Sequence, residues 1–424
     1  MKVLTVVGNR PQFVKAAAVS GHLRQRAEEV LVHTGQHYDR ELSAVFFEEL
    51  GLSPPEHELG VGSGTHAGQT GATMVRLEPL VEAQRPDAML VYGDTNATLA
   101  AALVGAKLLV PLAHVEAGMR SFDRRMPEEV NRVAADRLAG LLLCSTGGAV
   151  ANLEREGLGG RARLVGDVMA DVALRFGPIA ERRSHVLERF GLRRGGYLLA
   201  TAHRAANVDD PAALARLVEL LGAAAERFGP LVFPVHPRTC ARLGATGLLD
   251  SLERATRIQL CEPLGYLDFA CLTRGARAVL TDSGGLQKEA CLTGVPCLTL
   301  REETEWVETV ASGWNRLVGL DPERALSALA ELTGRRRGSK NLSHNLRAPL
   351  AAPDTLRGAA SSVGQMALPF GLPASYPRSV RHSPVAHAGY ETGSKPDPSI
   401  YGDGDAGARC VEELLAWLAQ TRRE

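Results

Sequence analysis

A strand–helix–strand pattern around Leu90–Arg132 constrains this chain more than any other feature. Two short apolar runs, Ala88–Tyr92 and Leu108–Ala113, flank an alanine- and leucine-rich segment of helical character. Parallel strands need a long crossover connection, usually a helix, and such crossovers are right-handed. The pattern therefore predicts an α/β fold with a parallel sheet.

The same alternation recurs along the chain in two series. Each apolar run ends abruptly in polar residues, glycine or proline, as a buried strand does where it leaves the sheet. We therefore expect one parallel sheet in residues 1–170 and a second in residues 171–331, with their strand ends meeting across a cleft. The further runs are Val3–Val7, Val30–His33, Leu141–Cys144, Tyr197–Thr201, Leu231–Val235, Arg257–Leu260, Ala278–Leu280 and Pro296–Leu300.

Composition and charge narrow the function classes. The chain of 424 residues carries 48 basic and 48 acidic side chains, so nucleic acid and anionic membranes are not expected partners. It has no apolar stretch of membrane-spanning length and no signal-peptide pattern at its start. Its 7 cysteines are scattered and never spaced C-x-x-C, which indicates a reducing cytoplasm and no zinc or disulfide framework.

Residues 332–398 differ in character from the rest of the chain. This stretch is rich in proline, serine, glycine and arginine and has weak periodicity. Long structureless loops are uncommon inside compact domains, so we expect a disordered insertion. An amphipathic pattern then predicts a final helix within 403–421.

Three carboxylates lie close to strand ends in the organising segment. Asp94 follows the first strand and Glu116 the second, and Glu128 begins a helix after Pro127. Ligands bind at the carboxyl ends of strands in open parallel sheets, so these groups should face one cavity and act as acid and base. The alternative for Asp94 is a helix N-cap.

A second set of residues suits an anion. Asp282–Glu289 opens from a strand through Ser283, Gly284 and Gly285 into a helix, so backbone N–H groups and the positive helix end can face a phosphate. A tight strand–helix turn is the alternative reading. The carboxylate of Glu289 is suited to accept a hydrogen bond from a ribose hydroxyl.

Cations and imidazoles also follow predicted strands. Arg10 and Lys15 flank the first strand-to-helix turn, and His203 follows a strand of the second series. The remaining strand-end groups that we expect to contact substrate are His236, Arg238, Tyr266 and Arg301. The alternative is that these cations are ordinary surface charges and that these histidines have a structural role.

Two cofactor readings are disfavoured. No G-x-G-x-x-G follows the first strand and no G-x-x-x-x-G-K-[ST] occurs, which argues against a nicotinamide enzyme and a Walker ATPase. His114 and Glu116 have no third ligand at diagnostic spacing, so no metal site is expected. Cations on one side and carboxylates on the other suit a diphosphate-linked substrate whose other end undergoes proton transfer.

Many separate motifs resemble the non-hydrolysing UDP-N-acetylglucosamine 2-epimerases, over Met1–Leu320 and again over Tyr401–Leu418. In chain order they are GNRPQFVKAA, TGQHYD, VYGDTNATLA, HVEAGMRS, MPEEVNR, TAHRAANVDD, PVHPRT, EPLGYLDF, TDSGGLQKEA and YGDG. The resemblance implies two Rossmann-like domains facing a cleft, the glycosyltransferase-B-type fold, with a C-terminal helix returning to the first domain. It also implies a cytoplasmic homodimer that supplies cell-envelope polysaccharide precursors.

The family reaction implies loss of the C2 proton with elimination of UDP, then re-addition with protonation of the opposite face, without metal or nicotinamide. Carried over by motif, Asp94, Glu116 and Glu128 become the acid/base residues, His203 is counted with them as a catalytic residue, and Glu289 holds the ribose. The residues implied at the diphosphate are Arg10, Lys15, Arg132, His203, Ser283, Gly284 and Gly285.

Some positions depart from the family pattern. Ala206 stands where a glutamate is common, and Trp306 where an arginine is common. Residues 36–43 differ from the family's activator segment, so allosteric activation is not expected. Several motifs resemble the branch that epimerises UDP-2,3-diacetamido-glucuronic acid, which stays open as the alternative substrate. A UDP-sugar glycosyltransferase and a non-catalytic UDP-sugar-binding protein are the other hypotheses.

Overall fold

The computed structural model describes residues 1–35, 45, 47–338 and 401–421. Its first sheet has seven parallel strands in the order β3-β2-β1-β4-β5-β6-β7. The strands are β1 Lys2–Val7, β2 Glu28–His33, β3 His57–Glu58, β4 Ala88–Tyr92, β5 Leu112–Ala117, β6 Leu141–Cys144 and β7 Ala162–Leu164. The accompanying helices are α1 Arg10–Arg24, α3 His66–Gln84, α4 Asn96–Lys107, α5 Pro127–Leu138 and α6 Gly147–Arg155, with the 3-10 turn η1 Gly159–Arg161.

The second sheet has six parallel strands in the order β10-β9-β8-β11-β12-β13. Its strands are β8 Leu198–Thr201, β9 Leu231–Pro234, β10 Ile258–Cys261, β11 Ala278–Thr281, β12 Cys297–Thr299 and β13 Asn315–Leu317. The helices of this part are α7 Val168–Arg183, α8 Val186–Arg189, α9 Ala205–Val208, α10 Pro211–Phe228, α11 Pro237–Thr246, α12 Leu249–Arg254, α13 Tyr266–Gly275, α14 Gly284–Leu292, α15 Val307–Ala311 and α16 Pro322–Gly338. The prediction of two parallel sheets in an α/β fold is confirmed.

Both faces of the first sheet are buried, as its composition requires. Along β1, Val3 and Val7 join one apolar core cluster, whereas Leu4 and Val6 join another. Successive side chains of a strand point to opposite faces, so a strand covered by helices on both sides reads as a continuous apolar run. This is why the strands could be located from hydrophobicity alone.

The strand order reverses between β1 and β4 in the first sheet and between β8 and β11 in the second. In doubly wound sheets a crevice opens at this point, outside the carboxyl ends of the strands. The loops that follow β1, β4, β8 and β11 therefore form the natural ligand-binding edge of each sheet.

Both sheets belong to one compact unit, which holds Met1–Thr333, and helix α7 spans residue 170. The division of the chain into domains at that residue stays a prediction. Helix α16 extends to Gly338, so residues 332–338 are helical, and the rest of the expected insertion lies outside the described residues.

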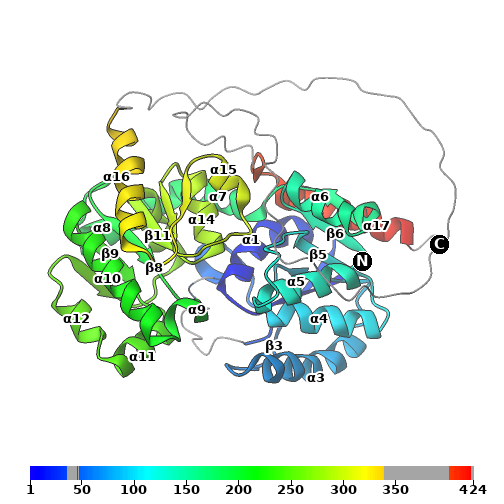
Figure 1. Ribbon diagram of the computed structural model, residues 1–424. Coiled ribbons are helices and arrows are strands. Elements are labelled where there is room, and N and C mark those ends of the chain that lie inside the picture. The colour runs from blue at the N-terminus through cyan, green and yellow to red at the C-terminus, as the bar shows by residue number, and fades with distance from the viewer. Residues whose placement is uncertain (36–44, 46, 339–400, 422–424) are drawn as a thin grey trace. The chain divides into compact units, whose positions relative to one another are not determined.

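Helix α17, Ala406–Thr421, packs against α1 (Figure 1). The contact is a backbone-to-backbone one, because a Cβ at Gly407 would overlap the carbonyl oxygen of Ala18. The Gly407 amide also donates to Asp171 Oδ2 at 2.7 Å. Among the described helices none is long and apolar enough to cross a membrane.

Gly407→Ala should therefore destabilise the protein. The Ala18 carbonyl is backbone and cannot turn aside, so α17 would have to move off α1, at a cost of about 1–3 kcal/mol or more in the free energy of unfolding. Gly222→Ala in α10 is the control: a Cβ there meets nothing within 4 Å, and alanine should stabilise the helix by about 0.5–1 kcal/mol. Urea unfolding measures both, and equal effects of the two variants would contradict this packing.

Candidate functional site

Glu116 lies at the end of β5 in an unusual backbone conformation. Its φ is 68°, in the left-handed region, and the pairing register between β5 and β6 shifts between Val115 and Ala117. A bulge of this kind re-aims a side chain, and a left-handed conformation outside glycine costs about 1–3 kcal/mol. The fold therefore maintains strain at this carboxylate.

Two lysine ammonium groups hold the Glu116 carboxylate. Lys15 Nζ of α1 is 2.5 Å from Glu116 Oε1, and Lys288 Nζ of α14 is 3.1 Å from Oε2. Burial alone would raise the pKa of Glu116, but the two cations outweigh it and hold the pKa at about 2. The carboxylate is thus fully ionised at neutral pH although only 7 % of the residue is exposed.

Gly93 makes room for this arrangement. Its φ is 60°, and a Cβ there would lie 2.7 Å from Lys15 Nζ and 3.4 Å from Glu116 Oε1. A side chain at this position would therefore displace the Lys15 ammonium from its place between β4 and β5.

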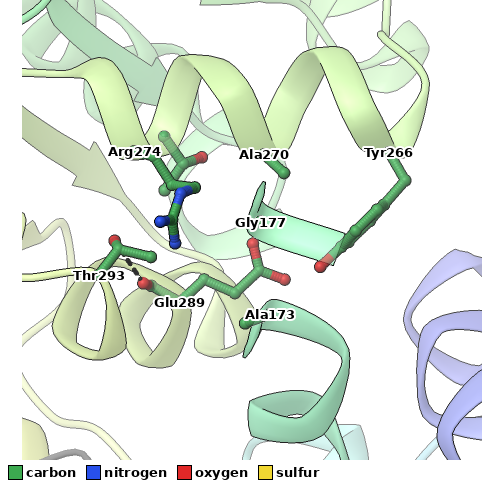
Figure 2. Close-up of a pocket in the computed structure, with 8 residues that line it drawn as sticks. Ala173, Gly177, Tyr266, Ala270, Arg274, Glu289 and Thr293 are labelled. Carbon is green, nitrogen blue, oxygen red and sulfur yellow. Dashed lines mark hydrogen bonds between the residues drawn. The ribbon is translucent and has the colours of Figure 1, made fainter. Parts of the chain in front are cut away.

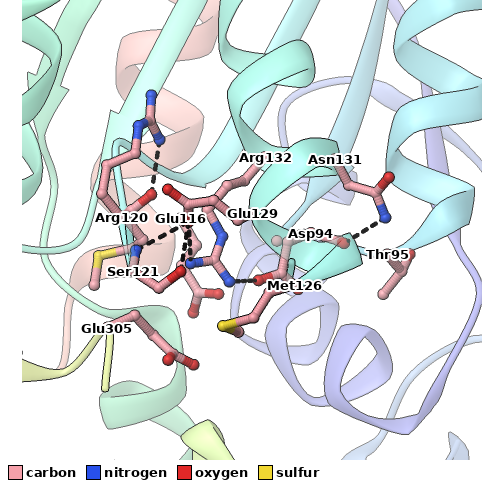
Figure 3. A network of polar contacts seen from close by, with 12 residues as sticks. Asp94, Thr95, Glu116, Arg120, Ser121, Met126, Glu129, Asn131, Arg132 and Glu305 are labelled. Atoms are coloured by element: carbon pink, nitrogen blue, oxygen red, sulfur yellow. Dashed lines mark hydrogen bonds and ion pairs between the residues drawn. The ribbon is translucent and has the colours of Figure 1, made fainter. Parts of the chain in front are cut away.

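Asp94 faces Arg132 of α5, and the two side chains form an ion pair (Figure 3). Asn131 Nδ2 donates to the Asp94 carbonyl at 3.0 Å and so anchors the same loop. The N-cap of α4 is Thr95, whose side chain accepts from the Thr98 amide. The alternative reading of Asp94 as a helix cap is therefore wrong.

Glu128 and Glu129, adjacent at the start of α5, have different surroundings. Glu129 is buried, contacts Arg132 at 3.1 Å and accepts from the backbone amides of Ser121 and Phe122 (Figure 3). Glu128 is half-buried, and within the described residues no hydrogen bond or ion pair of its carboxylate is found. The role of Glu128 as an acid/base residue therefore stays a prediction.

Helix α14 begins directly after β11 and presents its N-terminus at the edge of the second sheet. Ser283 is its N-cap, and the Ser283 side chain forms no capping hydrogen bond. The first amides of an α-helix have no partner within the helix, so those of Gly284 and Gly285 can serve an anion. A Cβ at Gly284 would lie 2.6 Å from Glu305 Oε1 and 2.8 Å from Trp306 Nε1, so only glycine fits.

Arginines from three elements converge on Glu305. Arg301 Nη1 lies 2.9 Å from Glu305 Oε2, and Arg204 Nη2 lies 3.6 Å from Oε1. Burial would raise the pKa of Glu305, but Arg301, Arg204 and Arg132 together lower it to about 2. Arg132 also pairs with Asp94 and Glu129, so Glu305 is the carboxylate that Arg301 and Arg204 share.

His203 lies at the end of β8 beside the start of α14. Its Nδ1 is 3.2 Å from Asp282 Oδ1, and its ring centroid is 5.8 Å from that of His236. The buried Asp282 carboxylate also accepts from the backbone amides of His203 and Arg204. The loop after β8 is thus fixed by the residue that precedes the α14 N-cap.

Arg10 and Arg238 have different surroundings. Arg10 Nη2 donates to the Leu264 carbonyl, which joins the start of α1 to the loop before α13. Arg238 forms an ion pair with Asp209 on an exposed surface, so in this conformation its guanidinium faces another side chain of the protein.

Glu289 and Tyr266 face each other in a small cavity between α7, α13 and α14 (Figure 2). The cavity of about 10 Å³ has room for about one water and is lined by Ala173, Gly177, Tyr266, Ala270, Thr273, Arg274, Glu289 and Thr293. Burial raises the pKa of Glu289 to about 7, against a partial opposing effect of Lys288. Glu289, the residue expected to bind the ribose, therefore has a buried carboxyl group whose pKa lies near neutral pH.

This raised pKa makes stability pH-dependent. The unfolded carboxyl loses its proton near pH 4.5 and the folded one near pH 7, so the native state holds the extra proton between these values. Stability should fall as the pH rises through that window. Glu289→Gln removes the effect: relative to the unchanged protein, its free energy of unfolding should gain roughly 1–3 kcal/mol between pH 4.5 and pH 8. Urea unfolding at both pH values measures it, and an equal difference at the two would contradict it.

His114 is not placed to bind a metal. Its Nδ1 lies 2.8 Å from Asp136 Oδ1 and its Nε2 lies 2.7 Å from the Gly93 carbonyl. Both ring nitrogens are therefore engaged by oxygen acceptors of the protein. Through Gly93 the imidazole instead supports the loop that carries Asp94.

Sequence reasoning missed several residues of the site. Lys288 and Asp167 form a buried ion pair of 2.5 Å, Trp306 stacks on the Lys288 ammonium at 3.7 Å, and Arg204 approaches Glu305. The local pattern around Lys288 reads as an ordinary helix, and nothing in it marks a fully buried ammonium. Trp306 fills a position where the family often has an arginine, and here its ring contacts a cation instead.

Comparison with known proteins gives one family. The family model described as UDP-N-acetylglucosamine 2-epimerase matches residues 21–360. A Methanococcus maripaludis protein described as a UDP-N-acetylglucosamine 2-epimerase homolog is 45% identical over 332 residues, which cover 78% of this chain and 92% of that protein. The Pseudomonas aeruginosa UDP-2,3-diacetamido-2,3-dideoxy-D-glucuronate 2-epimerase is 46% identical over 325 residues, 75% of this chain and 88% of that protein.

The fold comparison agrees with this result. The crystal structure of the Methanocaldococcus jannaschii UDP-GlcNAc 2-epimerase in complex with UDP-GlcNAc and UDP is similar with a TM-score of 0.81 and 35% sequence identity. The similarity covers 98% of this chain and 100% of that one. The chain therefore belongs to the UDP-N-acetylglucosamine 2-epimerase family.

Proposed function

We propose that this protein interconverts UDP-N-acetylglucosamine and UDP-N-acetylmannosamine by inverting C2. The observation that carries the proposal is the Glu116 carboxylate, held at a strained strand end between Lys15 and Lys288 and next to the Asp94–Arg132 pair. Removing a weakly acidic C–H proton needs a positioned base with positive charge close by. The similarity to proteins named for this reaction supports the same substrate.

The reaction conserves all atoms of the substrate. A carboxylate takes the C2 proton, the C1–oxygen bond breaks with its electron pair going to the diphosphate of UDP, and a C1=C2 double bond forms. UDP then adds back to C1 while a proton reaches C2 from the opposite face. Glu116 and Asp94 are the proposed proton-transfer groups, and Glu128 is the third candidate.

The anion-binding groups of the site hold UDP in this proposal. The amides at the start of α14 receive the diphosphate together with the cations around them, which stabilises the leaving group. Lys15 is then shared between two anions: as the diphosphate attracts its ammonium, the pKa of Glu116 rises toward the range in which a carboxylate accepts a proton. The proposed UDP contacts are Arg10, Lys15, Arg132, His203, His236, Arg238, Tyr266, Ser283, Gly284, Gly285, Glu289 and Arg301.

A second substrate is favoured by the arginines around Glu305. A glucuronate sugar carries a carboxylate that N-acetylglucosamine lacks, and Arg204 and Arg301, which share the single carboxylate of Glu305, offer cations for it. The relative from Pseudomonas aeruginosa is named for such a sugar. UDP-2,3-diacetamido-glucuronate is therefore the alternative substrate.

Proton NMR in heavy water tests the proposal. With UDP-N-acetylglucosamine we expect deuterium at C2 and a new manno-configured UDP-sugar. No reaction with this compound, but C2 exchange in UDP-2,3-diacetamido-glucuronate, would assign the alternative substrate. Sugar transfer to an added acceptor without deuterium at C2 would indicate a glycosyltransferase, and UDP binding without any exchange would indicate a binding protein.

The roles of the parts of the chain and its oligomeric state belong to the same proposal. Residues 1–170 supply the carboxylates, residues 171–331 supply the UDP site, and the helix within 403–421 returns to the first part. A homodimer is part of the proposal, and light scattering would test it. All 7 cysteines are free, which supports a cytoplasmic location.

A further inference from the structure

Lys288 is the most deeply buried charged group in contact with the proposed catalytic carboxylate. It lies on the second turn of α14 and is completely inaccessible to solvent. An isolated ammonium in such a place would lose its charge, because burial without a partner disfavours the cation. The arrangement around Lys288 shows instead a site built for a fixed positive charge.

Three groups surround the ammonium. Asp167 Oδ2 lies 2.5 Å from Nζ, Glu116 Oε2 lies 3.1 Å from it, and the Trp306 ring centroid is 3.7 Å away. A lysine ammonium has three N–H bonds, so two carboxylates and one aromatic face use all of them. Lys288 is therefore fixed in position, and it fixes one oxygen of Glu116.

The charges of this cluster balance. Lys15 and Lys288 contribute two positive charges, and Glu116 and Asp167 two negative ones. The charged groups that face Glu116 are thus Lys15 from α1 and Lys288 from α14, with Asp167 behind Lys288 at the N-cap of α7. Glu289 on α14 also neighbours Lys288 and Asp167, and Asp171 on α7 neighbours Asp167.

Position on α14 gives Lys288 a link to the nucleotide. The same helix begins at Gly284, whose amide belongs to the proposed diphosphate site, and Lys288 follows one turn later. The helix thereby connects the group that would bind UDP to the group that would move the C2 proton.

We propose that Lys288 is a positioning residue for the C2 proton transfer: it holds Glu116 charged and aimed, and it does so from the helix whose N-terminus binds the diphosphate. This inference rests on the proposed epimerase function. Lys15 is released to the substrate during the reaction, whereas Lys288 keeps its contact with Glu116 throughout.

The test distinguishes a positioning role of Lys288 toward Glu116 from a role in which Lys288 only compensates the buried charge of Asp167. Lys288→Met alone leaves Asp167 buried without its cation, so it is combined with Asp167→Asn, which balances the charge and keeps an N-cap residue. We expect the double variant to fold and bind UDP, with kcat lowered roughly 10- to 100-fold and KM little changed. The acidic limb of the kcat profile should move upward by roughly 1–3 pH units, because Glu116 has lost one of its two cations.

Asp167→Asn alone is the matched control. It keeps the contact between Lys288 and Glu116, so its acidic limb should not rise. If the double variant has the kcat and the pH profile of the Asp167→Asn protein, Lys288 only compensates the charge of Asp167 and the proposal is wrong.

A measurement on the unchanged protein covers the case of a variant that does not fold. In protein labelled with ¹³C at glutamate carboxyls, the Glu116 resonance, assigned by its loss in Glu116→Gln, should keep the shift of an ionised carboxylate down to pH 4. Titration of Glu116 near pH 4.5 would overturn the proposal. This readout needs no turnover, so absence of epimerisation by the unchanged protein would count against the proposed function and not against the role of Lys288.

Discussion

Glu116→Gln is expected to lower the rate of C2 hydrogen exchange by roughly 10²- to 10⁴-fold, because a carboxamide cannot accept the proton. Glutamine is nearly the same size, so the backbone bulge at this position should persist. UDP binding should be weakened far less than exchange, because the carboxamide oxygen of glutamine can still accept a hydrogen bond from one of the two lysines that Glu116 contacts. Exchange in heavy water measures the rate, and UDP titration measures binding.

Glu181→Gln is the matched control for this experiment. Glu181 is also a carboxylate between two cations, with Arg274 at 2.9 Å and Arg194 at 3.3 Å, but it lies on the partly exposed side of α7. Its replacement should leave the exchange rate unchanged and cost at most about 1 kcal/mol of stability. Exchange in Glu116→Gln within tenfold of the unchanged protein would contradict the role of Glu116 as a base.

Gly284→Ala is expected to have the second largest effect, on nucleotide binding. An added methyl would lie 2.6 Å from Glu305 Oε1 and 2.8 Å from Trp306 Nε1, both on buried side chains. The start of α14 or the Glu305–Trp306 segment must then shift, at a cost of about 1–3 kcal/mol in a packed interior. If that cost falls on the UDP complex, the Kd for UDP rises roughly 10- to 100-fold.

Gly285→Ala provides the comparison at the next residue. There the nearest atom to an added Cβ is Met169 Cε at 3.1 Å, the end of a flexible side chain. We expect UDP binding to weaken far less than in Gly284→Ala. Calorimetric titration of both variants with UDP measures the two affinities. Equal losses of affinity would show that the contact with Glu305 and Trp306 does not set the requirement for glycine at position 284.

Local pattern determined the architecture of this protein. Strands buried on both faces read as continuous apolar runs, so hydrophobicity along the chain was enough to locate β1, β4 and β5 and the polar residues after them. The rule that ligands meet the carboxyl ends of parallel strands then selected Asp94 and Glu116 as site residues.

Helix phase and capping were harder to predict. Glu128 and Glu129 are adjacent on α5, and which of them turns inward depends on a rotation of about 100° per residue that the local pattern leaves open. In the same way, Asp94 and Thr95 are both good N-cap residues, and the competing ion pair with Arg132 left the cap to Thr95.

Only the tertiary structure revealed the charge cluster around Glu116. Its members come from α1, β5, the start of α7 and α14, and Lys288 is 172 positions from Glu116 and 121 from Asp167 in the chain. The stability of a buried ion pair depends on which groups surround it after folding, and no local periodicity of the sequence encodes those neighbours. The sequence by itself determined where the strands end and which side chains follow them; folding alone decided which of those side chains meet, because burial makes each charge depend on partners that are distant along the chain.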